Sequence, residues 1–108
     1  MELDFDLYVR MSQEYSTYSE TYSECVLAQL AKASEELGET SSAFLTYAGF
    51  NPRKDSNSVT MADVKSEVTD TIGTLLVLLT IFSSDPERDL KLMQEKFSLR
   101  LKESQERL

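Results

Sequence analysis

The chain has 108 residues, a length typical of one domain, and its 28% charged and 41% hydrophobic residues are the proportions of an ordinary folded protein. Its 19 acidic residues outnumber 11 basic ones, and the net charge of −8 argues against binding to a nucleic-acid polymer, which needs a basic surface. The absence of histidine excludes Ser-His and Cys-His nucleophile pairs, HExxH zinc sites and the Glu-x-x-His ligands of di-iron bundles.

The cysteine content and the apolar segments bear on the cellular compartment. Cys25 is the single cysteine, so it cannot form an intramolecular disulfide, which favours a reducing, cytoplasmic setting. The acidic N-terminal segment MELDFDLYVR lacks the apolar run of a signal peptide. The longest apolar run, LLVLLTIF at 75–82, falls well short of the ~20 residues that cross a bilayer. We therefore expect a cytoplasmic protein without a membrane partner.

The first half of the sequence predicts two helices. The first covers about residues 3–15, where apolar and aromatic residues share one stripe: Leu3, Leu7, Tyr8, Met11 and Tyr15. The Tyr/Ser/Glu-rich stretch at 15–24 is interpreted as a connector. Thr21-x-x-Glu24 predicts a capping box that opens the second helix, and Gly49 is placed to stop that helix after about Ala48.

The second half predicts two more helices after a polar loop, GFNPRKDSNSV, which contains the breaker Asn51-Pro52. Thr60-x-x-Asp63 fits a second capping box, so Asp63 is interpreted as a cap, and the third helix runs to about Phe82. Asp85-Pro86 starts the fourth helix, which continues to the end of the chain.

These elements predict one all-α domain over residues 1–108, a compact four-helix bundle, because no alternating strand pattern occurs. The third helix is apolar all round at its end, Leu75 to Phe82, and such a surface has to be covered on every side. We expect self-association into a homodimer or homotetramer; burial at the centre of one bundle is the alternative.

Acidic pairs recur on two of the predicted helices. In EELGE, Glu35, Glu36 and Glu39 fall within a sector about 100° wide, and Glu67 and Asp70 repeat the i, i+3 spacing on the third helix. If the two helices lie side by side, Glu36, Glu39, Glu67 and Asp70 form a nest of like charges that a hard divalent cation would relieve. Oxygen-only ligands select Mg²⁺, with Mn²⁺ as a substitute.

A second interpretation gives the acids no ligand. Glutamates on helix surfaces are commonly solvated, and an ExxE or ExxD pair alone is weak evidence for a site. The chain would then be an acidic helical interaction or regulatory module without catalytic activity. Metal-dependent stabilisation separates the two interpretations.

The combination Glu35-Glu36-x-x-Glu39 and Glu67-x-x-Asp70 resembles the EExxE…ExxD signature of the all-α nucleoside triphosphate pyrophosphohydrolases, the MazG-like proteins and dimeric dUTPases. The resemblance extends over nearly the whole chain, and KFSLRLKES at 96–104 is similar to the KFxxR-type tail of MazG domains. Two features depart from the pattern: Thr71-Ile72-Gly73 replaces a more usual aliphatic run, and the loop before the third helix is long and polar.

The resemblance implies Mg²⁺-dependent hydrolysis of a nucleoside triphosphate to the monophosphate and pyrophosphate, in nucleotide pool control or house-cleaning. It implies that Glu36, Glu39, Glu67 and Asp70 hold the metal and that Glu35 orients or deprotonates the attacking water, although Glu35 is equally suited to be an exposed surface acid.

Basic and aromatic residues complete the candidate site. An acidic protein needs cations to attract a polyanion, and the candidates for binding the substrate phosphates are Lys32, Arg53, Lys54, Lys96 and Arg100. Each could instead pair with a surface acid such as Glu103. A base could stack on Tyr15, Tyr18, Tyr22, Phe44 or Tyr47, but aromatic residues at helical spacing are also typical of a core, so no nucleobase follows.

Overall fold

The computed structural model describes residues 1–107 and confirms an all-α fold, with no strand in that range. The helices are α1 (Phe5–Ser16), α2 (Tyr22–Tyr47), α3 (Met61–Phe82) and α4 (Pro86–Glu106), and a 3₁₀ turn, η1 (Ser56–Ser58), lies in the loop before α3. All four helices expected from the sequence are present, and each boundary lies within about two residues of its expected place.

Both expected capping residues at the starts of α2 and α3 accept hydrogen bonds. The Thr60 hydroxyl accepts from the Asp63 amide at 3.2 Å, and the Asp63 carboxylate accepts from the Thr60 amide at 2.8 Å, which completes the capping box of α3. At α2 the Thr21 hydroxyl accepts from the Glu24 amide at 3.1 Å, but the Glu24 carboxylate accepts from the Glu20 amide instead of closing the box. Asp63 is therefore a cap, as expected.

The other two helix boundaries also follow the sequence. Gly49 has φ of 81°, in the left-handed region that glycine adopts without a steric penalty, and it follows the end of α2 directly. Asp85 caps α4 by accepting from the Arg88 amide at 3.2 Å, and Pro86 is the first helical residue, where its missing N–H costs nothing.

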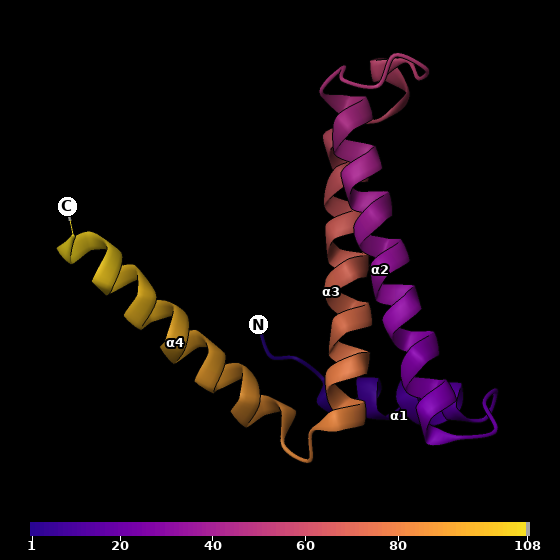
Figure 1. The fold of residues 1–108 in the computed structure, drawn as a ribbon, viewed down its shortest axis with the longest axis vertical. Helices are drawn as coiled ribbons and strands as arrows, with labels where there is room; N and C mark the ends of the chain where they lie inside the picture. Colours follow the sequence, from indigo (N-terminus) through magenta and orange to yellow (C-terminus); the bar gives the residue numbers. More distant parts are fainter. Residues whose placement is uncertain (108) are drawn as a thin grey trace.

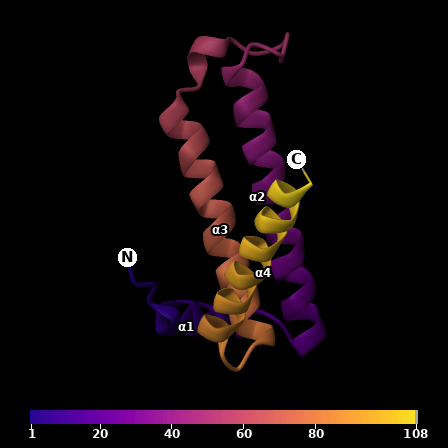
Figure 2. The same cartoon turned by 90° about the vertical axis from the view of Figure 1, so that its left-hand side faces the viewer.

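Helices α2 and α3 run antiparallel, side by side, and α1 lies across the end of the pair where α2 begins and α3 ends (Figures 1 and 2). The Thr80 hydroxyl of α3 donates to the Tyr8 carbonyl of α1 at 3.3 Å, which ties the two helices together. The buried apolar residues within 1–107 are few: Cys25, Val64, Leu76 and Val77.

Helix α4 does not pack on the other three, so the single chain does not form the compact four-helix bundle expected from the sequence. Figure 1 shows α4 leaving the end of α3 and projecting away, at 117° to α3. The radius of gyration is 17.3 Å, against about 13 Å for a compact domain of this length. The cause is local: Ser83 has extended backbone and Asp85 is also non-helical, and these residues turn the chain outward before Pro86 restarts the helix.

By length and composition, no single helix within residues 1–107 could cross a membrane; α3 and α4 pass such a test only when taken together as a sharply bent pair.

The capping box of α3 gives the first testable prediction. Replacing Thr60 by Ala removes the acceptor for the Asp63 amide, so the free energy of unfolding should fall by about 1 kcal/mol, measured by urea denaturation. Thr69→Ala in the same helix is the matched control. The Thr69 hydroxyl bonds only to the carbonyl of Ser66, one turn earlier, so stability should stay level or rise. Equal losses for both variants would contradict the capping role.

Candidate metal centre

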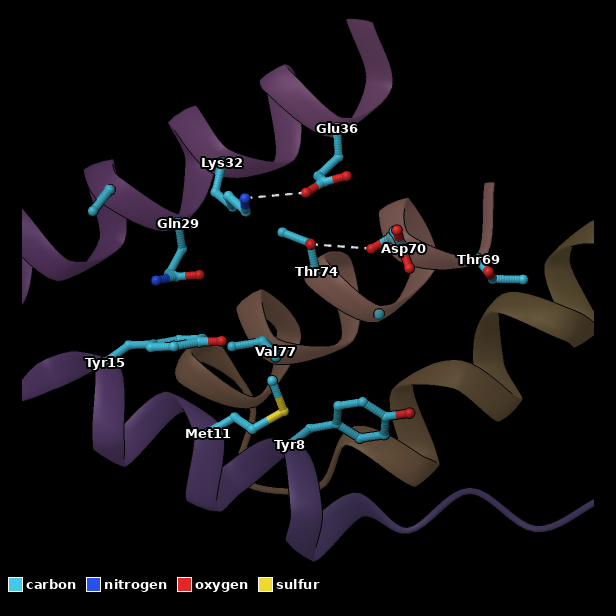
Figure 3. A pocket seen from close by; sticks show the side chains of 12 residues that line it. Tyr8, Met11, Tyr15, Gln29, Lys32, Glu36, Thr69, Asp70, Thr74 and Val77 are labelled. Carbon is cyan, nitrogen blue, oxygen red and sulfur yellow. Dashed lines mark hydrogen bonds and ion pairs between the residues drawn. The ribbon is translucent and has the colours of Figure 1, made fainter. Parts of the chain in front are cut away.

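Three carboxylates from two helices converge between α2 and α3. Glu36 comes from α2, and Glu67 and Asp70 come from α3; one oxygen of each lies within 4.8 Å of one oxygen of each of the others. Glu67 and Asp70 share a face of α3 because they are three residues apart, and Glu36 faces them from the neighbouring helix. Figure 3 shows Glu36 and Asp70 on these facing helices. We call Glu36, Glu67 and Asp70 the acidic cluster.

The acidic cluster is partly shielded from water. Glu36 is buried, with its side chain 11% exposed, Glu67 is half-buried, and Asp70 is exposed. The Oε2 atom of Glu67 is fully buried and has no hydrogen-bond partner among residues 1–107. A buried polar atom without a partner is costly, and more so when it carries charge. The donor set therefore fits a hard cation, which prefers carboxylate oxygens and would supply the missing partner.

Lys32 is the one predicted phosphate-binding residue that lies at the acidic cluster. Its Nζ is 3.1 Å from Oε1 of Glu36, one turn along α2, and about half of its side chain is exposed. The hydrogen bond to Glu36, and then the charges of Glu36 and Glu35, raise the pKa of Lys32. One ammonium facing three carboxylates leaves the cluster with a net negative charge if all three are ionised.

Glu39 lies at the margin of the acidic cluster. It is exposed and is not one of the three convergent carboxylates, but its pKa is raised, chiefly by the negative charge of Glu36 and further by desolvation and by Glu67. Glu35 is also exposed, and its charge contributes to the raised pKa of Glu39. Of the four predicted ligands, the structure thus gathers three and leaves Glu39 within their electrostatic reach.

Two threonines join α2 and α3 beside the acidic cluster. The hydroxyls of Thr40 and Thr71 lie 3.1 Å apart, and each is also about 3 Å from the backbone carbonyl of an acid one turn earlier, Glu36 or Glu67. This contact sets the register in which Glu36 faces Glu67. In the sequence, Thr71 stands out only as a departure from the MazG pattern; the signal that could have revealed the contact is a threonine four residues after an acid on both helices.

The other predicted phosphate-binding residues lie away from the acidic cluster in the single chain. Arg53 and Lys54 are in the loop after α2, whose last residue is already about 16 Å along the axis from Glu36. Lys96 and Arg100 are on the projecting α4, and the Arg100 guanidinium lies over the Phe97 ring at 5.3 Å. None of these four lines the pocket beside the cluster.

A pocket of about 510 Å³ adjoins the acidic cluster and lies between α1, α2 and α3. Lys32, Glu36 and Asp70 line one part of it, and residues of α1, including Tyr8 and Tyr15, line another (Figure 3). Its volume is in the range that holds small ligands and cofactors. Tyr8 and Tyr15 belong to the apolar and aromatic stripe predicted for α1, and Tyr15 is also one of the residues predicted as candidates for stacking a base.

Comparisons with protein-family models, with curated proteins and with solved structures found no match to this chain. The site consists of a partly buried acidic cluster with one adjacent lysine, at the side of a pocket that also has aromatic walls.

The raised pKa of Glu39 gives a prediction with a defined pH dependence. Because folding raises the pKa of Glu39, its ionised carboxylate is disfavoured in the folded state. Above the folded-state pKa, the charge of Glu39 therefore lowers the stability of the fold. This destabilisation is lost as the pH falls through that pKa. In metal-free buffer, Glu39→Gln should therefore raise the melting temperature at neutral pH and leave it unchanged in acid.

Glu2→Gln is the charge-matched control, because Glu2 precedes the first helix, and it should change the melting temperature at neither pH. A lower melting temperature for metal-free Glu39→Gln at neutral pH would contradict the repulsion among these carboxylates.

Proposed function

We propose that this chain hydrolyses a nucleoside triphosphate to the monophosphate and pyrophosphate, with Mg²⁺ as cofactor and Mn²⁺ as a substitute. The observation that carries the proposal is the acidic cluster: three carboxylates from two helices within 4.8 Å of one another, one of them with a buried, unpartnered oxygen. The same residues belong to the EExxE and ExxD segments whose spacing resembles that of the all-α nucleoside triphosphate pyrophosphohydrolases.

Glu36, Glu67 and Asp70 would hold the metal, with Glu39 as a fourth acid at the margin. When bound, a divalent cation supplies positive charge that offsets the charge of the phosphates and the charge that develops as a phosphoryl bond breaks. Glu36 is buried and Glu67 is half-buried, so their charges act more effectively on a ligand than exposed carboxylates would, because water screens them less.

The chain's own residues would bind and orient the substrate. Lys32 lies next to Glu36 and lines the pocket, so its ammonium is placed to contact a phosphate oxygen entering there. Glu35, exposed on the adjacent face of α2, is the residue proposed to orient or deprotonate the attacking water. Lys96 and Arg100 would reach the phosphates only if α4 moved or if a second copy of the chain supplied them.

Self-association belongs to this proposal. Ile72, Leu75 and Phe82 of α3 are each about half exposed, and α4 leaves further large apolar side chains exposed: Leu92, Met93, Phe97, Leu99 and Leu101. So many exposed apolar side chains on one small chain are typical of an interaction surface. A homodimer or homotetramer would cover them.

The same exposed apolar residues favour the second candidate function, an acidic interaction or regulatory module without catalysis. In that case the partner would be another protein, and the acidic cluster would be a partly solvated surface without a ligand. The two candidates differ in their response to metal: only the enzyme requires that Mg²⁺ or Mn²⁺ bind the folded chain and stabilise it by mass action.

The central prediction is Mg²⁺-dependent release of pyrophosphate from at least one nucleoside triphosphate, measured across a panel of bases and sugars. Glu67→Gln and Asp70→Asn should each abolish this release, because both keep the size of the side chain and remove a ligand charge from the acidic cluster. They should also remove the rise in melting temperature that Mn²⁺ gives the wild type. That rise reflects a stabilisation of about 2.7 kcal/mol when the free Mn²⁺ concentration is 100 times the dissociation constant.

Glu2→Gln should retain full activity and the full response to Mn²⁺. If no nucleotide in the panel is hydrolysed and millimolar metal leaves the melting temperature flat, the interaction module becomes the better account.

Self-association predicts a particle mass of at least two chains at micromolar concentration, measured by sedimentation or light scattering. Phe97→Glu should shift the mass toward one chain, because it places a charge on the exposed apolar side of α4. Ser98→Glu, on the same helix but at a polar position, is the control and should leave the mass unchanged. A monomeric wild type would refute the proposed assembly.

A further inference from the structure

Gln29 is a buried polar residue that the metal-centre chemistry leaves without a role. Only 9% of the residue is exposed, and its side-chain amide has no hydrogen-bond partner within residues 1–107; unlike Oε2 of Glu67, the amide atoms are not fully buried, so they reach the solvent of the pocket. It lines the pocket next to the acidic cluster, and Figure 3 shows the amide pointing away from α2 toward the α1 side of the pocket, near Tyr15. Because the residue is nine-tenths buried and its unpaired amide opens into the pocket, the amide is available to hydrogen-bond a ligand bound there.

The position of Gln29 relative to the acidic cluster matches the shape of a nucleotide. Gln29 and Glu36 are two helical turns apart on the same face of α2, about 10 Å along the axis. A nucleotide with its phosphates at Glu36 and Lys32 would extend its base in the direction of Gln29 and the aromatic residues of α1. Gly73 leaves room in the pocket wall, because a methyl group at its Cα would meet no atom within 4 Å.

We propose that Gln29 is a specificity-determining residue that reads the edge of the nucleobase, with Tyr15 beside it as an aromatic surface for the ring. This inference rests on the proposed function in taking a nucleotide as the ligand. An amide offers one donor and one acceptor side by side, so it pairs in bidentate fashion with any base edge that presents an acceptor next to a donor. The aromatic side chain adds stacking that is insensitive to the base.

The test measures binding of uridine, cytidine, adenosine and guanosine to the full chain in EDTA, by NMR or calorimetry. These probes lack phosphates and the buffer lacks metal, so the result does not depend on hydrolysis. At least one nucleoside should bind, and Gln29→Leu should weaken its binding at least about fivefold, the low end for a bidentate contact to a base. Gln94→Leu on α4 is the matched control and should bind as the wild type does.

A second variant separates base reading from a packing role. A carboxylate only accepts hydrogen bonds, and guanine presents two adjacent donors, so Gln29→Glu should raise the ratio of guanosine to uridine affinity. A structural role would lower all affinities by the same factor. The inference is overturned if no nucleoside binds up to its solubility, if Gln29→Leu binds as the wild type does, or if the ratios stay constant in Gln29→Glu.

The outcomes also distinguish this inference from the proposed function. If hydrolysis is verified and the Gln29 variants keep the wild-type base preference, the role of Gln29 is refuted and the proposed function stands. Nucleoside binding that depends on Gln29, without hydrolysis of any triphosphate, would refute the enzyme and leave the base subsite in place.

Discussion

The close pairing of α2 with α3 is the constraint on which the rest of the structure depends, because it holds like charges together against their repulsion. Packing of the two helices and the hydroxyl contact between Thr40 and Thr71 fix the register, and in that register Glu36 faces Glu67 across the interface. The arrangement costs free energy without a cation, because Lys32 forms an ion pair with Glu36 alone within residues 1–107 and the pKa of Glu39 is still raised by its acidic neighbours. Uncompensated repulsion among carboxylates that the fold holds together is typical of a ligand site.

Local patterns in the sequence predicted the helices well, because each boundary is decided by a few adjacent residues. The start of α3 is capped by Thr60 and Asp63, and the start of α4 is formed by Asp85 and Pro86. Gly49 follows the end of α2 with the positive φ that suits glycine. The direction of α4 could not be predicted in this way. It depends on the backbone at Ser83 and Asp85, which turns the chain outward even though α3 and α4 both carry exposed apolar side chains.

The candidate site was predicted in part for a similar reason. Spacing places Glu67 and Asp70 on one face of a helix, but whether they meet Glu36 depends on the register between two helices, which no single helix encodes. The same holds for Thr40 with Thr71 and for Gln29, whose isolation from partners is visible only when α1 lies across the pocket (Figure 3). The basic residues illustrate the converse: Lys96 and Arg100 share a face, as expected, yet that face is distant from the acidic cluster in one chain.

The small interior of the single chain has a thermodynamic consequence. Within residues 1–107 only four apolar residues, Cys25, Val64, Leu76 and Val77, are buried, while large apolar side chains on α2, α3 and α4 already meet solvent in the folded state. Unfolding one isolated chain therefore exposes little additional apolar surface. The heat-capacity increment and the denaturant slope both scale with that newly exposed surface, so both would be small for a domain of this length, and the isolated chain would unfold over a broad range of temperature or urea.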